Sequence, residues 1–130
     1  MANPEYSLLE RNRIANNMFG GVDFEIRAYS DTISASGSGG TEITADGYSP
    51  IEIENDTTNF PLATLGTRSN AVVFEKIFTE AAEIVSIGIF AQASGDFLGR
   101  RVLDEPLEIS AGQVWRFPIG SIIFAPVNPS

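Results

Sequence analysis

The chain has 130 residues, of which 17 are acidic and eight basic, so that its net charge is −9. This length fits one domain, and 43% hydrophobic with 19% charged residues is the composition of a globular protein. A surface this acidic repels a phosphate backbone, so the composition argues against nucleic acid as a partner.

The chain contains no histidine and no cysteine. Their absence excludes disulfides, zinc sites of the usual ligand sets, and Ser-His-Asp or Cys-His catalysis. We therefore expect no enzymatic activity, no metal site and no cofactor. The chain also lacks an apolar run of roughly 18–20 residues and a basic, apolar leader, so we expect no membrane insertion and no signal-peptide export.

Residues 7–19 read SLLERNRIANNMF and predict a short helix. Ser7 and Glu10 have the spacing of a capping box, and Gly20-Gly21 provides a left-handed exit at the other end. The apolar residues form a loose stripe at helical spacing: Leu8, Leu9, Ile14, Ala15, Met18 and Phe19. This stripe either packs on the chain's own domain or docks on a neighbouring subunit, which makes Leu8, Leu9, Ile14, Met18 and Phe19 interface candidates.

From Val22 the period of the apolar residues changes to two, as in a half-buried strand. Further strands are predicted at Tyr48–Glu54, Ala71–Phe78, Ile84–Phe90, Phe97–Leu103, Leu107–Ile109, Val114–Phe117 and Ser121–Phe124. Seven or eight short strands predict a mainly β fold, an antiparallel β-sandwich or barrel-like domain over residues 22–130. Residues 1–21 would form an N-terminal segment with a short helix, a possible docking arm.

The stretch IVSIGIFAQASGDFLGRRVL, residues 84–103, predicts a hairpin around Ala93-Ser94-Gly95-Asp96. In its return strand Arg100 and Arg101 are adjacent and therefore lie on opposite faces. One of the two arginines is a candidate for an intersubunit contact with an acidic neighbour.

Two polar segments predict loops: Ser30–Thr41, which is rich in serine and glycine, and Asn55–Asn59. We expect Ser30–Thr41 to be exposed and mobile, because its residues bury little apolar area. Its Ser-Gly-Ser-Gly-Gly run lacks the trailing Gly-Lys-Ser/Thr of a phosphate-binding loop.

Three other groups of residues could carry chemistry, and each has a simpler structural interpretation. Glu52 with Glu54, or Asp104 with Glu105, could form a carboxylate pair for glycoside cleavage, but solvated strand faces explain them as well. Trp115 could be a ligand platform, although a core aromatic is the expected role. A third group could bind calcium but lacks EF-hand spacing: Glu54, Asp56 and Asn59.

Several motifs follow one another along the chain in a fixed order. They are Gly40 to Ile43, Gly47-Tyr48, Gly88 to Gly95, Pro106, Ala111-Gly112 and Phe117 to Gly120. In this order, and with a helix near residues 12–20, the chain resembles small tailed-phage virion proteins often labelled tail fibre or head fibre proteins. Gln92 stands where that family more often has Asp.

The resemblance implies a non-enzymatic structural protein located in the virion after synthesis in the host cytoplasm. It implies a homo-oligomer, with a trimer favoured, bound to other tail or capsid proteins and able to contact a host surface. A tail-associated role, as a fibre, fibre adaptor or baseplate component, is the leading interpretation. Two alternatives stay open: a capsid decoration protein that cements the head, and, more distantly, a carbohydrate-binding or carbohydrate-active protein.

Overall fold

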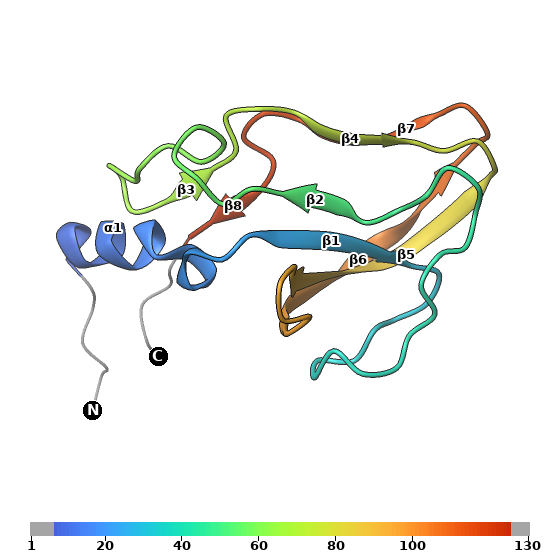
Figure 1. The fold of residues 1–130 in the computed structure, drawn as a ribbon, viewed down its shortest axis with the longest axis horizontal. Helices are drawn as coiled ribbons and strands as arrows, with labels where there is room; N and C mark the ends of the chain where they lie inside the picture. The colour runs from blue at the N-terminus through green and yellow to red at the C-terminus, as the bar shows by residue number, and fades with distance from the viewer. Residues whose placement is uncertain (1–6, 126–130) are drawn as a thin grey trace. The chain divides into compact units, whose positions relative to one another are not determined.

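The computed structural model describes residues 7–125 of the chain. It is mainly β, with antiparallel sheets and one short N-terminal helix, so the predicted fold class is confirmed. Of the two predicted alternatives, the sheets do not close into a barrel, and they are consistent with a sandwich-like arrangement (Figure 1). Within residues 7–125, no helix has the length and apolarity needed to cross a membrane.

The described chain forms two compact units. The first comprises residues 7–21, 55–73 and 117–125, and the second comprises Val22–Glu54 and Phe74–Arg116. The N-terminal helix thus shares a compact unit with two later segments of the chain. The division of the chain into segments 1–21 and 22–130 stays a prediction.

The first unit begins with the helix α1 (Leu8–Asn16), followed by the 3₁₀ turn η1 (Met18–Gly21). Ser7 Oγ accepts a hydrogen bond of 3.1 Å from the Glu10 amide, which confirms the predicted N-cap. The Glu10 carboxylate accepts from Arg13 Nε at 2.9 Å instead of completing a capping box. The helix ends before Phe19 because Phe19 and Gly20 are left-handed, with φ of 52° and 68°.

Side-chain amides hold α1 against the segment that follows Phe60. Asn12 Oδ1 accepts from the Gly66 amide at 2.6 Å, and Asn16 Oδ1 accepts from the Ala63 amide at 2.7 Å. Ala15 of α1 is fully buried, whereas Leu8 and Leu9 are exposed. The helix therefore docks within its own unit through polar contacts and leaves part of its apolar stripe uncovered.

The short strands β3 (Arg68–Ser69) and β8 (Ile123–Phe124) pair antiparallel and complete the first unit. Asn70, which follows β3, is buried, and its side-chain amide donates to the carbonyls of Val72 and Pro118 at 2.8 and 2.9 Å. Its Oδ1 accepts from the Ile122 amide at 2.9 Å. Asn70 thereby ties together two segments of this unit that are distant in the sequence.

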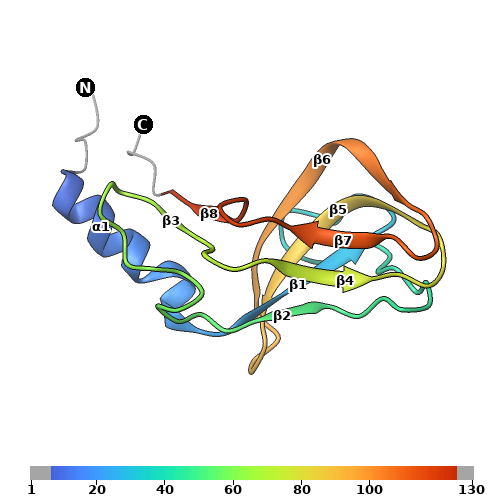
Figure 2. The ribbon, with the colours of Figure 1, turned by 90° about the horizontal axis from the view of Figure 1, so that it is seen from above.

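The second unit contains a four-stranded antiparallel sheet in the order β2-β1-β5-β6 (Figures 1 and 2). Its strands are β1 (Phe24–Tyr29), β2 (Ile51–Ile53), β5 (Ala82–Ala91) and β6 (Phe97–Ile109). A separate two-stranded sheet pairs β4 (Phe74–Ile77) with β7 (Val114–Phe117). Ile26 lies opposite Ile51 on one side and Ile89 on the other, so the period-two pattern predicted from Val22 onward builds an apolar face.

Aromatic side chains pack in the core of this second unit. Tyr48, Phe78 and Trp115 pack together, with the Tyr48 ring 5.9 Å from Phe78 and 6.3 Å from Trp115. Trp115 is buried, which confirms its expected role as a core aromatic. A second cluster joins Tyr29, Ile33 and Phe90, with Phe97 packed against it.

The Ser30–Thr41 loop is not wholly exposed, contrary to the expectation from its composition. Ile33 is fully buried, and its amide donates to Ser86 Oγ at 3.1 Å. Ser86 Oγ in turn donates to the Asp31 carbonyl at 2.6 Å. The expectation considered the serines and glycines and overlooked Ile33, whose burial anchors the loop to β5.

Candidate functional site

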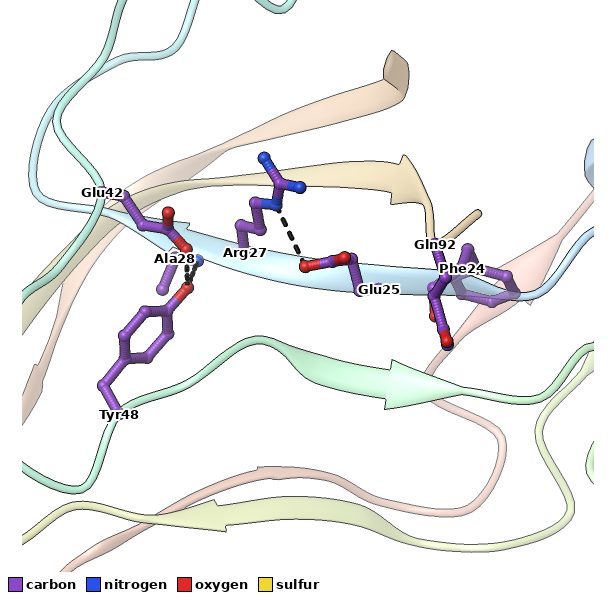
Figure 3. Close-up of polar contacts among 7 residues, drawn as sticks. All are labelled: Phe24, Glu25, Arg27, Ala28, Glu42, Tyr48 and Gln92. Atoms are coloured by element: carbon purple, nitrogen blue, oxygen red, sulfur yellow. Dashed lines mark hydrogen bonds and ion pairs between the residues drawn. The ribbon is translucent and has the colours of Figure 1, made fainter. Parts of the chain in front are cut away.

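The polar contacts along β1 are drawn in Figure 3, and the half-buried Tyr48 takes part in two of them. The Tyr48 hydroxyl donates to Glu42 Oε2 at 2.6 Å and accepts from the Ala28 amide at 2.9 Å. Burial, together with the hydrogen bond to Glu42, raises the pKa of Tyr48 above its usual value. The phenol therefore stays neutral and joins two segments of the unit rather than exchanging protons.

The two remaining contacts in Figure 3 are structural as well. Arg27 Nε donates to Glu25 Oε2 at 3.1 Å. Outside the figure, the Arg27 guanidinium carbon lies 4.0 Å from the centre of the Phe90 ring. Gln92 Nε2 donates to the Phe24 carbonyl at 2.8 Å, which ties the end of β5 to the start of β1. These groups satisfy one another within the fold.

The structure places the residues that were considered for catalysis or metal binding. Within residues 7–125, no three or more His, Cys, Asp or Glu side chains are grouped so that they could hold a metal ion. Asp56 Oδ1 accepts from the amides of Thr58 and Asn59 at 3.1 and 2.8 Å, as in a polar turn. The carboxylates proposed as pairs are all exposed on strands or at their ends: Glu52, Glu54, Asp104 and Glu105.

The helical interface candidates differ in accessibility. Leu8 and Leu9 are exposed, and Leu9 has 81% of its surface accessible. Ile14 and Phe19 are half-buried, and the Phe19 ring meets Phe124 edge-on at 5.6 Å. Met18 is buried within the first unit, so only part of the predicted stripe can be reached from outside.

The two arginine candidates lie next to each other on β6 but have different surroundings. Arg100 is opposite Gly88, and its Nη1 donates to the Ile33 carbonyl at 2.6 Å. Arg101 is opposite Ile87 and is exposed, and its side chain has no hydrogen bond or ion pair within residues 7–125. Arg100 therefore fastens the Ser30–Thr41 loop, and Arg101 is the arginine free to meet another chain.

The first unit contains an open groove of about 340 Å³ between the 61–71 segment and Ile119-Gly120. Its apolar lining is strongly exposed: Leu62 at 58%, Leu65 at 78% and Ile119 at 65%. The buried Asn70 also lines it and fixes the groove's two sides. Sequence patterns missed this groove because its leucines belong to no strand or helix. The one sequence feature that could have indicated it is the apolar segment PLATLG, from Pro61 to Gly66.

No family model matches the chain, and no match to a curated protein was found. The described residues define a β-rich protein with exposed apolar side chains that border an open groove.

Proposed function

We propose that the chain is a non-enzymatic structural protein of a tailed-phage virion, associated with the tail as a fibre, fibre adaptor or baseplate component. It would act as a homo-oligomer that binds other virion proteins. The phage setting rests on the ordered motifs between Gly40 and Gly120 that resemble fibre proteins.

The observation that carries an assembly role is the exposed apolar groove of the first unit. Around the groove, the side chains of Leu62, Leu65 and Ile119 are exposed to solvent. A protein that acts alone as a monomer would usually have polar residues at such exposed positions. Exposed apolar side chains gathered at an open groove are typical of protein–protein contacts. The groove would seat an apolar segment of a neighbouring virion protein.

One observation favours the second candidate, a capsid decoration protein. Leu8 and Leu9 are exposed on α1, as a docking arm on a capsid lattice would require. The carbohydrate alternative is weaker, because the buried Trp115 offers no face on which a sugar ring could stack.

The assembly role is tested by replacing both Leu65 and Ile119 with serine in the phage genome that encodes the chain. Because both side chains are exposed, the variant should keep its circular dichroism spectrum and melting temperature. We expect its copy number per particle to fall at least about tenfold, since two apolar side chains that would be buried against the neighbouring virion protein are removed. The matched control is Ile77→Ser, an exposed position on β4 in the second unit. Equal incorporation of the groove variant and the control would contradict the proposal.

A further inference from the structure

The strand β6 is an edge strand of the four-stranded sheet. It spans Phe97–Ile109 and pairs with β5 on one side, and none of the described strands pairs with its other side. Its residues from Arg100 to Val102 and from Asp104 to Glu108 are exposed. A long exposed edge presents free backbone donors and acceptors to a second strand.

The middle of this edge has a self-complementary charge pattern. Residues 100–105 read RRVLDE, two basic residues and two acidic residues separated by an apolar pair. Arg101, Asp104 and Glu105 have no ion-pair partner within residues 7–125. A second copy running antiparallel would bring basic residues opposite acidic ones at both ends, whereas a parallel copy would bring like charges together.

Two-fold symmetry narrows the possible registers. Side chains that lie opposite one another in an antiparallel strand pair share a face of the sheet. A two-fold axis between the two β6 strands therefore places one residue of the first copy opposite the same residue of the second copy. With Leu103 at the axis, Arg101 of each copy lies opposite Glu105 of the other. With Val102 at the axis, Arg100 lies opposite Asp104. We favour the register with Leu103 at the axis. It pairs Arg101, whose side chain has no partner among the described residues, whereas Arg100 is already bonded to the Ile33 carbonyl.

The pairing of β6 with β5 is irregular at residues 103–106, which leaves this part of β6 accessible to a second strand. Val102 lies opposite Ser86 and Leu107 opposite Ile84, so residues 103–106 bulge beside the single residue Val85. Pro106 has no amide proton, which limits a strand contact to a short stretch ending there. The contact is therefore short and relies on its charge pairs for orientation.

We propose that two copies of this chain associate through the β6 edge, antiparallel about a two-fold axis near Leu103, with Arg101 of each copy paired to Glu105 of its partner. This inference goes beyond the proposed function and can be tested on the isolated protein. Two-fold pairing gives even numbers of copies, so a trimer would require a second, different contact.

The test is sedimentation velocity on the full chain from about 1 to about 500 µM, because dimer formation depends on protomer concentration. The wild type should show a monomer–dimer equilibrium. Arg101→Glu and Glu105→Arg should each weaken self-association at least about tenfold, because each places like charges together at two symmetric positions. Mixing the two variants in equal amounts should restore dimers, since the introduced glutamate then faces the introduced arginine, and the native Glu105 of one copy faces the native Arg101 of the other.

The controls are Arg13→Glu on α1 and Glu80→Arg before β5, which make the same changes in net charge at exposed positions. Both controls should dimerise like the wild type. A wild type that stays monomeric throughout the concentration range would overturn the proposal. So would variants that associate normally, or a mixture that fails to dimerise while each variant keeps the wild-type melting temperature.

Discussion

At the scale of single residues, the polar groups with the most contacts stabilise the fold. Tyr48, Asn70 and Arg68 each join segments that are distant in the sequence, Arg68 through a bond of 3.1 Å from its Nη1 to the Asn16 carbonyl. Arg68 is buried, and its Nε and Nη2 donate to the Phe60 carbonyl at 3.1 and 2.7 Å. A buried charge that is bonded to carbonyl oxygens supports a loop conformation in the way a backbone ladder supports a strand.

Tyr48 gives the protein a predictable loss of stability at alkaline pH. Its pKa is raised in the fold by burial and by the bond to Glu42, so the folded state holds its proton more tightly than the unfolded state. That contribution to stability is present below the ordinary tyrosine pKa and is lost as pH rises above about 10. We expect Tyr48→Phe to lower the free energy of unfolding by about 1–2 kcal/mol at neutral pH, because the Ala28 amide loses its acceptor.

When the pH is raised from neutral to alkaline, the free energy of unfolding of Tyr48→Phe should fall by less than that of the wild type. Urea unfolding at a series of pH values measures both effects. Burial also raises the pKa of Tyr29, so Tyr29→Phe serves as the comparison and should keep the part of the alkaline loss due to Tyr48. Parallel curves for the wild type and Tyr48→Phe would show that Tyr48 does not cause the loss.

At the scale of elements, the ladder between β5 and β6 contains an unfavourable pair. Glu83 lies directly opposite Glu108, and like charges in that position repel. Glu108→Lys should raise the free energy of unfolding by about 0.5 kcal/mol in low salt. The gain should shrink in about 1 M salt, where exposed charges are screened.

Thermal unfolding of Glu108→Lys beside Glu80→Lys checks this expectation. Glu80 is exposed and precedes β5, so the second variant changes the net charge equally without a ladder partner. An equal gain in both variants would attribute the effect to net charge and contradict the pairing argument.

The sequence predicted most elements but not all of their limits. Period two located β1, β5 and β7, and the Ser7 cap located the start of α1. Two predicted strands, Phe97–Leu103 and Leu107–Ile109, are one strand, β6, because the chain bulges around Pro106 instead of breaking. The two-residue β3 has no periodicity of its own and is defined only by its pairing with β8.

At the scale of the whole molecule, sequence reasoning named candidate contact residues but not which of them are accessible. Either Arg100 or Arg101 was expected to be a contact residue, and both are exposed, whereas Met18 was a further candidate and is buried. Which apolar residue is buried depends on contacts between distant segments, and a local pattern contains no such information. The groove at Leu65 and Ile119 arises in this way, from two segments about fifty residues apart.

The most direct test of the proposed virion role is the copy number of this chain in purified phage particles. Quantitative mass spectrometry, scaled to the major capsid protein, measures it. A tail-associated component predicts a few to a few dozen copies in each particle, while a number close to that of the capsid protein would indicate the decoration alternative. Absence of the chain from purified particles would contradict the virion assignment altogether.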